Sequence, residues 1–448
     1  MNSVMKSLRD KYKDKNLLVV GLGLLGGGVG VAKFFAKLGA KVTVTDLKNS
    51  RQLASSIKEL KGLPITFHLG KHDPGDFIDA DVIFKGPFVP WDLSGIVEAE
   101  KQGIPIEMEL SFFAEYCPAK IIGITGTRGK STTTYMIYKL LKALRFPVFL
   151  GGGLPGISTI SLLPKLTNRD WVVMELPSWP LAGFHQKHIS PNIAVFTNFY
   201  PDHLNFYKDI DKYLLDKKAV YLYQNIKDYL IAGKQLQGII QKDHPKSHTI
   251  YFQAADFPYE FNYLHGDHNK ENAAASLSVA KALKLNMYRS IDILKQFKGL
   301  AFRQEIIGKK DNIVFVNDST STTPIATIKA IEAFQHGRII LILGGNSKQL
   351  PHSKLLFHLK SVDKIVILAG TFTDEIMSKL KRMYPEKITK KYDNLSTAVK
   401  KAYQLAIKNP KKKTYILFSP GATSFAMFNN EFHRGEEFNK YVSSIICS

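Results

Sequence analysis

The sequence predicts an α/β protein of three domains, each built on a mostly parallel sheet. The chain has 448 residues, which is too many for one ordinary hydrophobic core and is typical of about three domains. Strand-like apolar runs alternate with helix-like segments along most of its length. Two glycine-rich turns, at 21–30 and 126–129, each stand between a strand-like run and a helix-like segment. We therefore expect two phosphate-binding loops at helix N-termini.

The first segment, residues 1–117, has the pattern of a Rossmann-like domain. A strand at 16–20 leads into the glycine-rich stretch, a helix over 31–38 and a second strand that ends at Asp46. An acidic residue about 20 positions after a G-x-G-x-x-G turn is the dinucleotide-binding fingerprint, which on its own favours a NAD-dependent oxidoreductase. The residues predicted to bind the ligand here are Gly23, Leu24, Leu25, Gly26 and Asp46.

The second segment, residues 118–299, opens on GITGTRGKSTTT at 123–134. A strand, a glycine-rich turn and a helix start make a P-loop, in which Lys130 reaches the terminal phosphates and a following hydroxyl binds Mg²⁺. Ile124 stands where the full motif has its first glycine, so the match is to the shorter form G-T-x-G-K-S. The residues predicted to contact ATP in this loop are Gly126, Thr127, Arg128, Gly129, Lys130, Ser131 and Thr132.

Polar residues follow two further strand-like runs of the second segment. Glu175 ends the run at 171–174, and Asp202-His203 follows the run at 193–197. Ligands of open α/β sheets bind beyond the carboxyl ends of the strands. A carboxylate and an imidazole at neighbouring strand ends near a P-loop therefore predict Mg²⁺ ligands at Glu175 and His203.

The third segment, residues 300–448, repeats the alternation of strands and helices and predicts a second Rossmann-like, doubly wound unit.

Composition narrows the class of protein. The net charge is +22, from 61 basic and 39 acidic residues, but the lysines are scattered and no zinc-finger or RNA-binding pattern accompanies them, so we expect no specific nucleic acid. No apolar run reaches the roughly 18 residues of a membrane span. The charged N-terminus lacks a signal-peptide core, and Cys117 and Cys447 form no metal or redox pattern. We expect a cytoplasmic, monomeric protein.

Several blocks, in collinear order over nearly the whole chain, resemble the Mur ligase family, the ATP-dependent amino-acid ligases of peptidoglycan synthesis. The P-loop TGTRGKS resembles the family's TGTNGK[ST], and Asn198–Leu204 resembles N-x-x-x-D-H-L. The other blocks are GLGLLG at 21–26, ELPS at 175–178, YLLDK at 213–217, GDHNKEN at 266–272, Arg303 after Gly299-Leu300, NDS at 317–319, GGNSK at 344–348 and SPGATSF at 419–425 with Arg434-Gly435.

The resemblance implies an amide ligase that uses an acyl-phosphate intermediate. The first segment would bind UDP-N-acetylmuramoyl-L-alanine rather than NAD, the second ATP, and the third D-glutamate. Two Mg²⁺ ions are implied, one held by Ser131 and Glu175 and one by His203 and a carbamylated lysine. The spacing Tyr-x-x-x-Lys selects Lys217 over its neighbour Lys218 for that carbamylation.

The same resemblance assigns the remaining site residues. Lys130, Glu175, His203 and Lys217 are implied to be catalytic. Asn272, Arg303 and Asp318 are implied to contact ATP. Thr322, Lys348, Ser424 and Phe425 are implied to hold the amino acid, because a lysine and two hydroxyls suit its carboxylates.

The chain departs from the family pattern at several positions. Phe88 replaces a glycine of S-P-G, and Gly153 replaces the asparagine of G-G-N-I-G. The other departures are Pro177, Trp179 and Pro180 in E-L-S-S-F-Q-L, Thr320 in N-D-S-K-A-T, and Glu431 where an aromatic residue is usual. The changes at Phe88, at Gly153 and within 177–180 affect the expected contacts with the UDP-sugar. Glu431 affects the expected binding of the amino acid, because its carboxylate would repel a glutamate side chain.

Three alternatives stay open at this point. One is a family member with another amino acid or acceptor, such as a folyl- or poly-γ-glutamate ligase. The second is the NAD-dependent oxidoreductase, which leaves Lys130, Glu175 and His203 unexplained. The third is a non-catalytic nucleotide-binding or interaction protein, favoured by the departures at Thr320 and Glu431.

Overall fold

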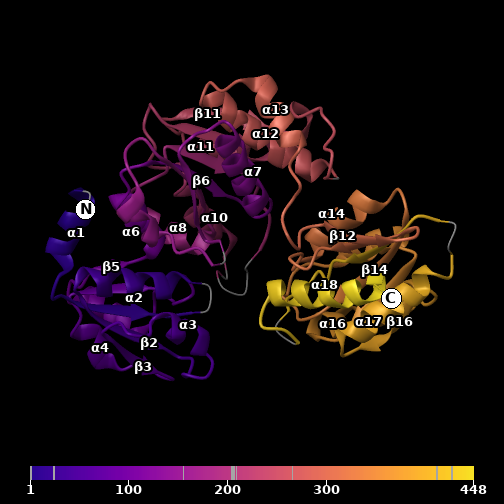
Figure 1. Ribbon diagram of the computed structural model, residues 1–448, viewed down its shortest axis with the longest axis horizontal. Coiled ribbons are helices and arrows are strands. Elements are labelled where there is room, and N and C mark those ends of the chain that lie inside the picture. Colours follow the sequence, from indigo (N-terminus) through magenta and orange to yellow (C-terminus); the bar gives the residue numbers. More distant parts are fainter. Residues whose placement is uncertain are drawn as a thin grey trace. The chain divides into compact units, whose positions relative to one another are not determined.

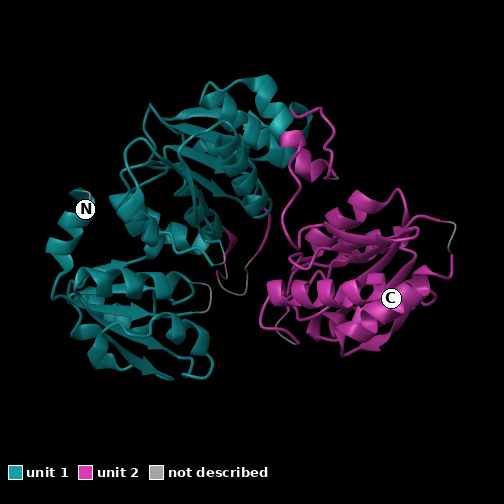
Figure 2. Cartoon of the chain, in the orientation of Figure 1, with its two compact units in different colours: residues 1–199, 211–256, 271–293 teal, residues 200–210, 257–270, 294–448 magenta. Residues whose placement is uncertain are grey.

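The computed structural model describes residues 3–23, 26–154, 156–202, 207, 209–264, 266–409, 412–424 and 427–447. The chain contains three sheets, each with helices around it, and is a three-domain α/β protein as predicted (Figure 1). It divides into two compact units, and the first, residues 1–199, 211–256 and 271–293, contains two of the sheets (Figure 2). No helix in the described ranges combines the length and apolar character that crossing a membrane requires.

The first sheet has the strand order β3-β2-β1-β4-β5, and all its neighbouring strands are parallel. Its strands are β1 (Asn16–Val20), β2 (Lys41–Asp46), β3 (Ile65–Leu69), β4 (Val82–Lys85) and β5 (Ile106–Glu107). The associated helices are α1 (Ser3–Tyr12), α2 (Gly27–Leu38), α3 (Ala54–Glu59), α4 (Pro74–Ile78), α5 (Ser94–Lys101) and α6 (Glu109–Tyr116). The strand order reverses between β1 and β4, so the ligand crevice of such a sheet lies at their carboxyl ends.

The second sheet is also parallel and has the order β11-β10-β9-β6-β8-β7. Its strands are β6 (Lys120–Thr125), β7 (Val148–Gly152), β8 (Trp171–Glu175), β9 (Ile193–Phe196), β10 (Tyr229–Gly233) and β11 (His248–Phe252). The α-helices that follow these strands are α7 (Lys130–Ala143), α8 (Ser178–Lys187), α10 (Ile210–Lys218), α11 (Gln237–Lys242), α12 (Asp267–Ala282) and α13 (Met287–Lys295). Short 3₁₀ helices are η1 (Ile160–Lys165), η2 (Lys234–Leu236) and η3 (Ala254–Asp256).

The third sheet, in the second unit, has the order β12-β13-β17-β14-β15-β16, and only the β12–β13 pair is antiparallel. Its strands are β12 (Glu305–Lys310), β13 (Ile313–Asn317), β14 (Arg338–Gly344), β15 (Lys364–Leu368), β16 (Ile388–Tyr392) and β17 (Thr414–Phe418). The helices around it are α14 (Pro324–Phe334), α15 (Ser353–His358), η4 (Leu359–Ser361), α16 (Thr371–Met383), α17 (Leu395–Ala406) and α18 (Glu431–Cys447).

The central strands are apolar and fully buried, as expected for parallel sheets covered on both faces. Every residue of β9 and of β13 is buried, for example. This burial fixes the strand ends, and thereby the loops that follow them, on rigid supports.

The helix after the first glycine-rich turn begins earlier than predicted. The sequence predicts its start at Val31, because glycine is a poor helix former, but α2 begins at Gly27. The reason is tertiary packing, since a Cβ atom on Gly30 would collide with the hydroxyl of Ser158. Close approach of the helix to the second sheet's domain therefore overrides local propensity.

Candidate active site

The P-loop lies between β6 and α7, as predicted (Figure 1). Lys130 is the first residue of α7, and its Nζ donates to the carbonyl oxygens of Gly126 at 3.0 Å and Thr127 at 3.2 Å. These bonds fold the Lys130 side chain back onto the P-loop. A nucleotide phosphate would replace the carbonyls as the partner of the ammonium group, because a charge-assisted bond is the stronger one.

The segment after β9 holds the P-loop in shape. The carbonyl oxygen of Asn198 accepts from the backbone N–H of Thr127 at 2.9 Å, and its Oδ1 accepts from the N–H of Arg128 at 2.8 Å. Asn198 Nδ2 and Thr197 Oγ1 both donate to the carbonyl of Arg128, at 3.1 and 2.6 Å. Asn198 was not among the predicted site residues. Its position directly after β9, next to the P-loop strand, is the sequence feature that could have indicated its role.

Glu175 ends β8 next to the start of the loop. The parallel register pairs Glu175 with Ile124, so the carboxylate follows the strand adjacent to the P-loop strand. Glu175 is buried, and among the described residues no group hydrogen-bonds its Oε2. An unpartnered buried carboxylate oxygen is costly unless a cation or water completes it. The residue therefore fits a Mg²⁺ ion held jointly with Ser131 in the first turn of α7.

Lys217 and Lys218 have different surroundings. Lys217 is 1% exposed, and its Nζ donates to the carbonyl of Gly126 at 2.9 Å and lies 4.8 Å from the centre of the Tyr213 ring. Lys218 instead forms an ion pair with Asp243 at 2.9 Å. Lys217, which the Tyr-x-x-x-Lys spacing selects, thus contacts the P-loop, whereas Lys218 is paired with Asp243.

Asn272 joins the P-loop from a distant part of the sequence. Its Oδ1 accepts from Thr133 Oγ1, which lies on α7, at 3.2 Å, and a side chain at Gly129 would collide with it. The first unit therefore brings together Lys130, Ser131, Glu175, Lys217 and Asn272. His203 lies outside the described residues, as do Leu24, Leu25 and Phe425. Among the residues that are described, no group of three or more His, Cys, Asp or Glu is arranged to hold a metal ion.

The glycine-rich turn of the first domain is tied to Asp46. The N–H of Gly23 donates to Asp46 Oδ2 at 3.2 Å, and the N–H of Lys48 donates to Asp46 Oδ1 at 2.9 Å. Gly23 and Gly26 have positive φ, 63° and 99°, which glycine adopts without strain. Asp46 thus braces the turn that follows β1.

The remaining predicted residues lie in the second unit. Lys348 Nζ donates to Thr322 Oγ1 at 3.2 Å, which places an ammonium and a hydroxyl together. Ser424 is 3% exposed, and its Oγ has no hydrogen-bond partner among the described residues. Thr320 Oγ1 donates to the carbonyl of Phe302 at 2.8 Å, so this departure ties the segment after β13 to the segment before β12.

Asp318 is buried beside Arg303 and Ser419. Burial raises its pKa to about 6, although hydrogen bonds from Ser321, Ser419 and the N–H of Gln304 and the charge of Arg303 oppose the rise. The unfolded chain therefore releases this proton at lower pH than the folded chain does. Stability contributed by this group is present below pH 4 and is lost as the pH rises towards 6.

An Asp318→Asn variant should remove that pH dependence. The wild type is expected to lose on the order of 3 kcal/mol of its free energy of unfolding between about pH 3 and pH 7 relative to the variant, for a shift of about two pKa units. Urea unfolding at several pH values measures the difference. Parallel curves for the two proteins would show that Asp318 titrates as an ordinary carboxyl.

Two departures from the family pattern contact each other. A Cβ atom at Gly153 would lie 2.7 Å from Cγ of Pro177, so the proline ring occupies the space where an asparagine side chain would begin. Gly153 follows β7 and Pro177 precedes α8. The two substitutions are therefore coupled.

A double-mutant cycle tests this coupling. Gly153→Asn alone should lower the free energy of unfolding by about 2 kcal/mol, because it overpacks the site. The same change in the Pro177→Ser background should cost at least about 1 kcal/mol less. Urea unfolding of the four proteins gives the coupling energy, and a value of zero would show that the contact constrains neither residue.

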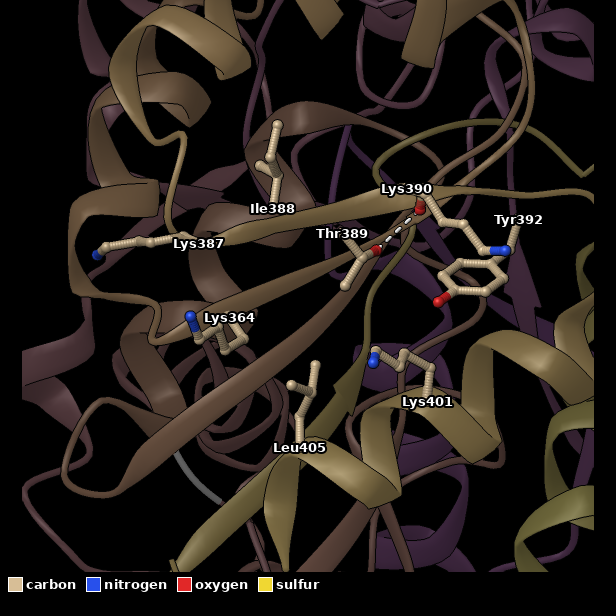
Figure 3. Close-up of a pocket in the computed structure, with 8 residues that line it drawn as sticks. All are labelled: Lys364, Lys387, Ile388, Thr389, Lys390, Tyr392, Lys401 and Leu405. Atoms are coloured by element: carbon tan, nitrogen blue, oxygen red, sulfur yellow. Dashed lines mark hydrogen bonds between the residues drawn. The ribbon is translucent and has the colours of Figure 1, made fainter. Parts of the chain in front are cut away.

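One pocket of the second unit contains none of the predicted site residues. Its volume is about 360 Å³, and it is lined by four residues of β16, by Lys387 just before that strand, by Lys364 of β15, and by Lys401 and Leu405 of α17 (Figure 3). Lys364 and Lys387 direct their ammonium groups to backbone carbonyls. Lysines along an edge strand such as β16 prevent pairing with other strands, which accounts for this basic surface without a ligand.

Comparison with known proteins identifies the class of protein that this fold and site define. Three family models match in order: a MurD-like N-terminal domain of Mur ligases over residues 15–107, the Mur ligase middle domain over 124–262, and the glutamate ligase domain of Mur ligases over 302–421. The chain belongs to the Mur ligase family.

Two curated relatives align over almost the full length of both chains. The UDP-N-acetylmuramoylalanine–D-glutamate ligase of Roseiflexus sp. (strain RS-1) is 33% identical, with 96% of this chain and 98% of that protein covered. The ligase of the same name from Borreliella afzelii (strain PKo) is 32% identical, with 97% and 99% covered.

Solved structures share the fold at lower identity. The UDP-N-acetylmuramate–alanine ligase MurC of Thermotoga maritima matches with a TM-score of 0.62 at 19% identity, over 96% of this chain and 99% of that one. The MurF ligase of Thermotoga maritima in complex with ADP matches with a TM-score of 0.58 at 17% identity, over 99% and 100%.

Proposed function

We propose that this chain joins D-glutamate to UDP-N-acetylmuramoyl-L-alanine at the expense of ATP, in the cytoplasmic synthesis of peptidoglycan precursors. The observation that carries the proposal is the full-length match to ligases of that name, in a chain that itself contains the P-loop, Glu175 and the ordered motifs. No finding supports the oxidoreductase alternative, because the family models account for both glycine-rich turns.

The first step that we propose is phosphoryl transfer. A carboxylate oxygen of the UDP-linked substrate attacks the γ-phosphorus of ATP, ADP leaves, and an acyl phosphate forms. Such a transfer depends on positioning and charge neutralisation more than on covalent chemistry by the protein. Lys130 would exchange the carbonyls of Gly126 and Thr127 for the γ-phosphate, and its partly buried setting strengthens that contact.

Two Mg²⁺ ions would complete the ATP site, one held by Ser131 and Glu175 and one by His203 and carbamylated Lys217. When bound, Mg²⁺ neutralises charge on the phosphate oxygens. The buried, unpartnered Oε2 of Glu175 supports the first of these sites. Carbamylation would turn the Lys217 amine from a donor to the P-loop into an anionic ligand.

In the second step, the amino group of the amino acid attacks the acyl carbon, the amide bond forms and phosphate leaves. Lys348, Thr322, Ser424 and Phe425 would hold the amino acid, and the pairing of an ammonium with a hydroxyl suits a carboxylate. Asn272, Arg303 and Asp318 would contact ATP. We propose boundaries near residues 117 and 299 for the three domains that bind UDP-sugar, ATP and amino acid, and a monomeric enzyme.

Phosphate release tests the proposal. Release should require ATP, Mg²⁺, UDP-N-acetylmuramoyl-L-alanine and D-glutamate together, and omission of any one should reduce it to background. The same assay with the twenty standard amino acids tests the role of Glu431, the first residue of α18. Release with another amino acid but never with D-glutamate would assign the chain to a different amino-acid substrate, and no release with any amino acid would contradict the ligase activity.

A further inference from the structure

Glu109, the first residue of α6, joins three elements of the first unit. Its Oε1 accepts from the backbone N–H groups of Thr159 at 2.9 Å and of Ile160 at 3.2 Å, where η1 begins. Its Oε2 lies against the first residue of α2, because a Cβ atom on Gly27 would be 2.9 Å from it. One carboxyl group therefore contacts α2 in the first sheet's domain and η1 in the second sheet's domain.

Through α2, Glu109 is connected to the glycine-rich turn. Gly26 stands directly before the helix with a φ of 99°, which glycine adopts without strain. A Cβ atom on Gly28 would lie 2.5 Å from the carbonyl oxygen of Leu22, so the first turn of α2 packs directly on the segment after β1. The carboxyl group of Glu109 thus supports the end of α2 that faces the glycine-rich turn.

Through Thr159, Glu109 is connected to the strand end that carries Glu175. The N–H of Gly152, the last residue of β7, donates to Thr159 Oγ1 at 2.8 Å. Gly152 pairs with Glu175 in the parallel register of β7 and β8, and the carbonyl of Glu175 accepts from the N–H of Gly153 at 2.8 Å. Hydrogen bonds of this kind around a functional side chain fix its position.

The carboxyl group of Glu109 acts here as a hydrogen-bond acceptor. Burial raises its pKa to about 7, although the two N–H bonds oppose the rise. Both the acid and the carboxylate are therefore populated near neutral pH, and each form has an oxygen that can accept from the two N–H groups. The position of that oxygen matters more for these contacts than a full negative charge does.

The substrate of the proposed reaction must extend from the glycine-rich turn to the γ-phosphate beside Glu175. Its length is set by covalent bonds, so the distance between these two ends decides whether the reacting atoms meet. We propose that Glu109 is a positioning residue that sets this distance, an inference that rests on the proposed function. Glu109 acts through α2 and β7 and does not itself contact the substrate.

Steady-state kinetics of Glu109→Ala and Glu109→Gln test the proposal. The alanine variant should lower kcat/KM for UDP-N-acetylmuramoyl-L-alanine about a hundredfold, which is the effect of a misplacement of about 1 Å. The glutamine variant keeps an acceptor oxygen on a side chain of the same length and should stay within about threefold of the wild type. The KM for ATP and inhibition by free UDP should change less than about twofold in both variants, because each of these ligands binds to one domain.

Glu115→Ala is the matched control. Glu115 lies on the same helix and pairs with Lys187 of α8, so its removal breaks another contact between the same two domains. This variant should keep kcat/KM within about twofold of the wild type, because a partly exposed ion pair contributes little. Thermal unfolding of all three variants separates a loss of positioning from a loss of structure.

A Glu109→Ala enzyme with the kcat/KM of the wild type would overturn the positioning role and leave the proposed function intact. A glutamine variant as slow as the alanine variant would overturn it too, because the acceptor oxygen would then not be what matters. Loss of UDP inhibition in step with kcat/KM would place the effect in the uridine site and likewise overturn it. A wild type that does not turn over the substrate would overturn both proposals.

Discussion

Replacing Lys130 by alanine is expected to lower kcat for phosphate release about a hundredfold to a thousandfold. Its ammonium group already lies over the P-loop, bonded to the carbonyls of Gly126 and Thr127. The alanine variant would leave the charge that develops on the γ-phosphate without its side-chain cation, and removal of one such contact costs about 3–4 kcal/mol. Initial rates at saturating substrates measure the effect.

Lys139→Ala is the matched control for that experiment. Lys139 lies on the same helix and is exposed, so its removal should leave kcat within about twofold of the wild type. Thermal unfolding of both variants separates lost chemistry from lost structure. A Lys130→Ala enzyme with more than about a tenth of wild-type activity would show that the loop binds something other than the reacting phosphate.

Replacing Lys217 by arginine or glutamine is expected to lower kcat about a hundredfold, because neither side chain can become a carbamate ligand for a metal ion. In solution with isotopically labelled bicarbonate, the wild type should show a carbamate carbon signal in NMR spectra that both variants lack. Two variants are needed because Lys217 is buried against the P-loop, and the arginine must fit into the same space.

Lys218→Gln distinguishes the two neighbouring lysines. Its ammonium group is paired with Asp243, so the change should cost about 1 kcal/mol of stability or less and leave kcat and the carbamate signal intact. A carbamate signal that disappears with Lys218 and persists without Lys217 would reassign the modification.

The architecture could be predicted from the sequence because parallel strands buried on both faces are continuous apolar runs. The strand that leads into the P-loop and the one that ends at Glu175 are such runs, and β6 and β8 pair as neighbours. The edge strands were harder. Ile65–Leu69 and Ile388–Tyr392 contain polar residues and are only partly buried, so neither has the apolar pattern of a central strand.

The site could be predicted only where a local pattern fixes a residue's role. Lys130 follows from the glycine-rich turn that precedes a helix, Glu175 follows from its place at a strand end, and Lys217 follows from the resemblance. The bonds from the Thr127 and Arg128 N–H groups to Asn198 join residues 71 and 70 positions apart, which no local pattern encodes. The coupling of Gly153 with Pro177 and the contact of Phe88 with Trp179 are likewise tertiary, although each residue was recognisable as a departure.

Transfer of an isotopic oxygen label tests the central claim most directly. UDP-N-acetylmuramoyl-L-alanine labelled in its alanyl carboxylate oxygens is turned over with ATP, Mg²⁺ and D-glutamate, and the inorganic phosphate is analysed by mass spectrometry. An acyl-phosphate ligase must transfer one labelled oxygen to each phosphate released. Phosphate that is released in step with amide formation but carries no label would contradict the mechanism, and unlabelled phosphate without any amide product would contradict the ligase activity itself.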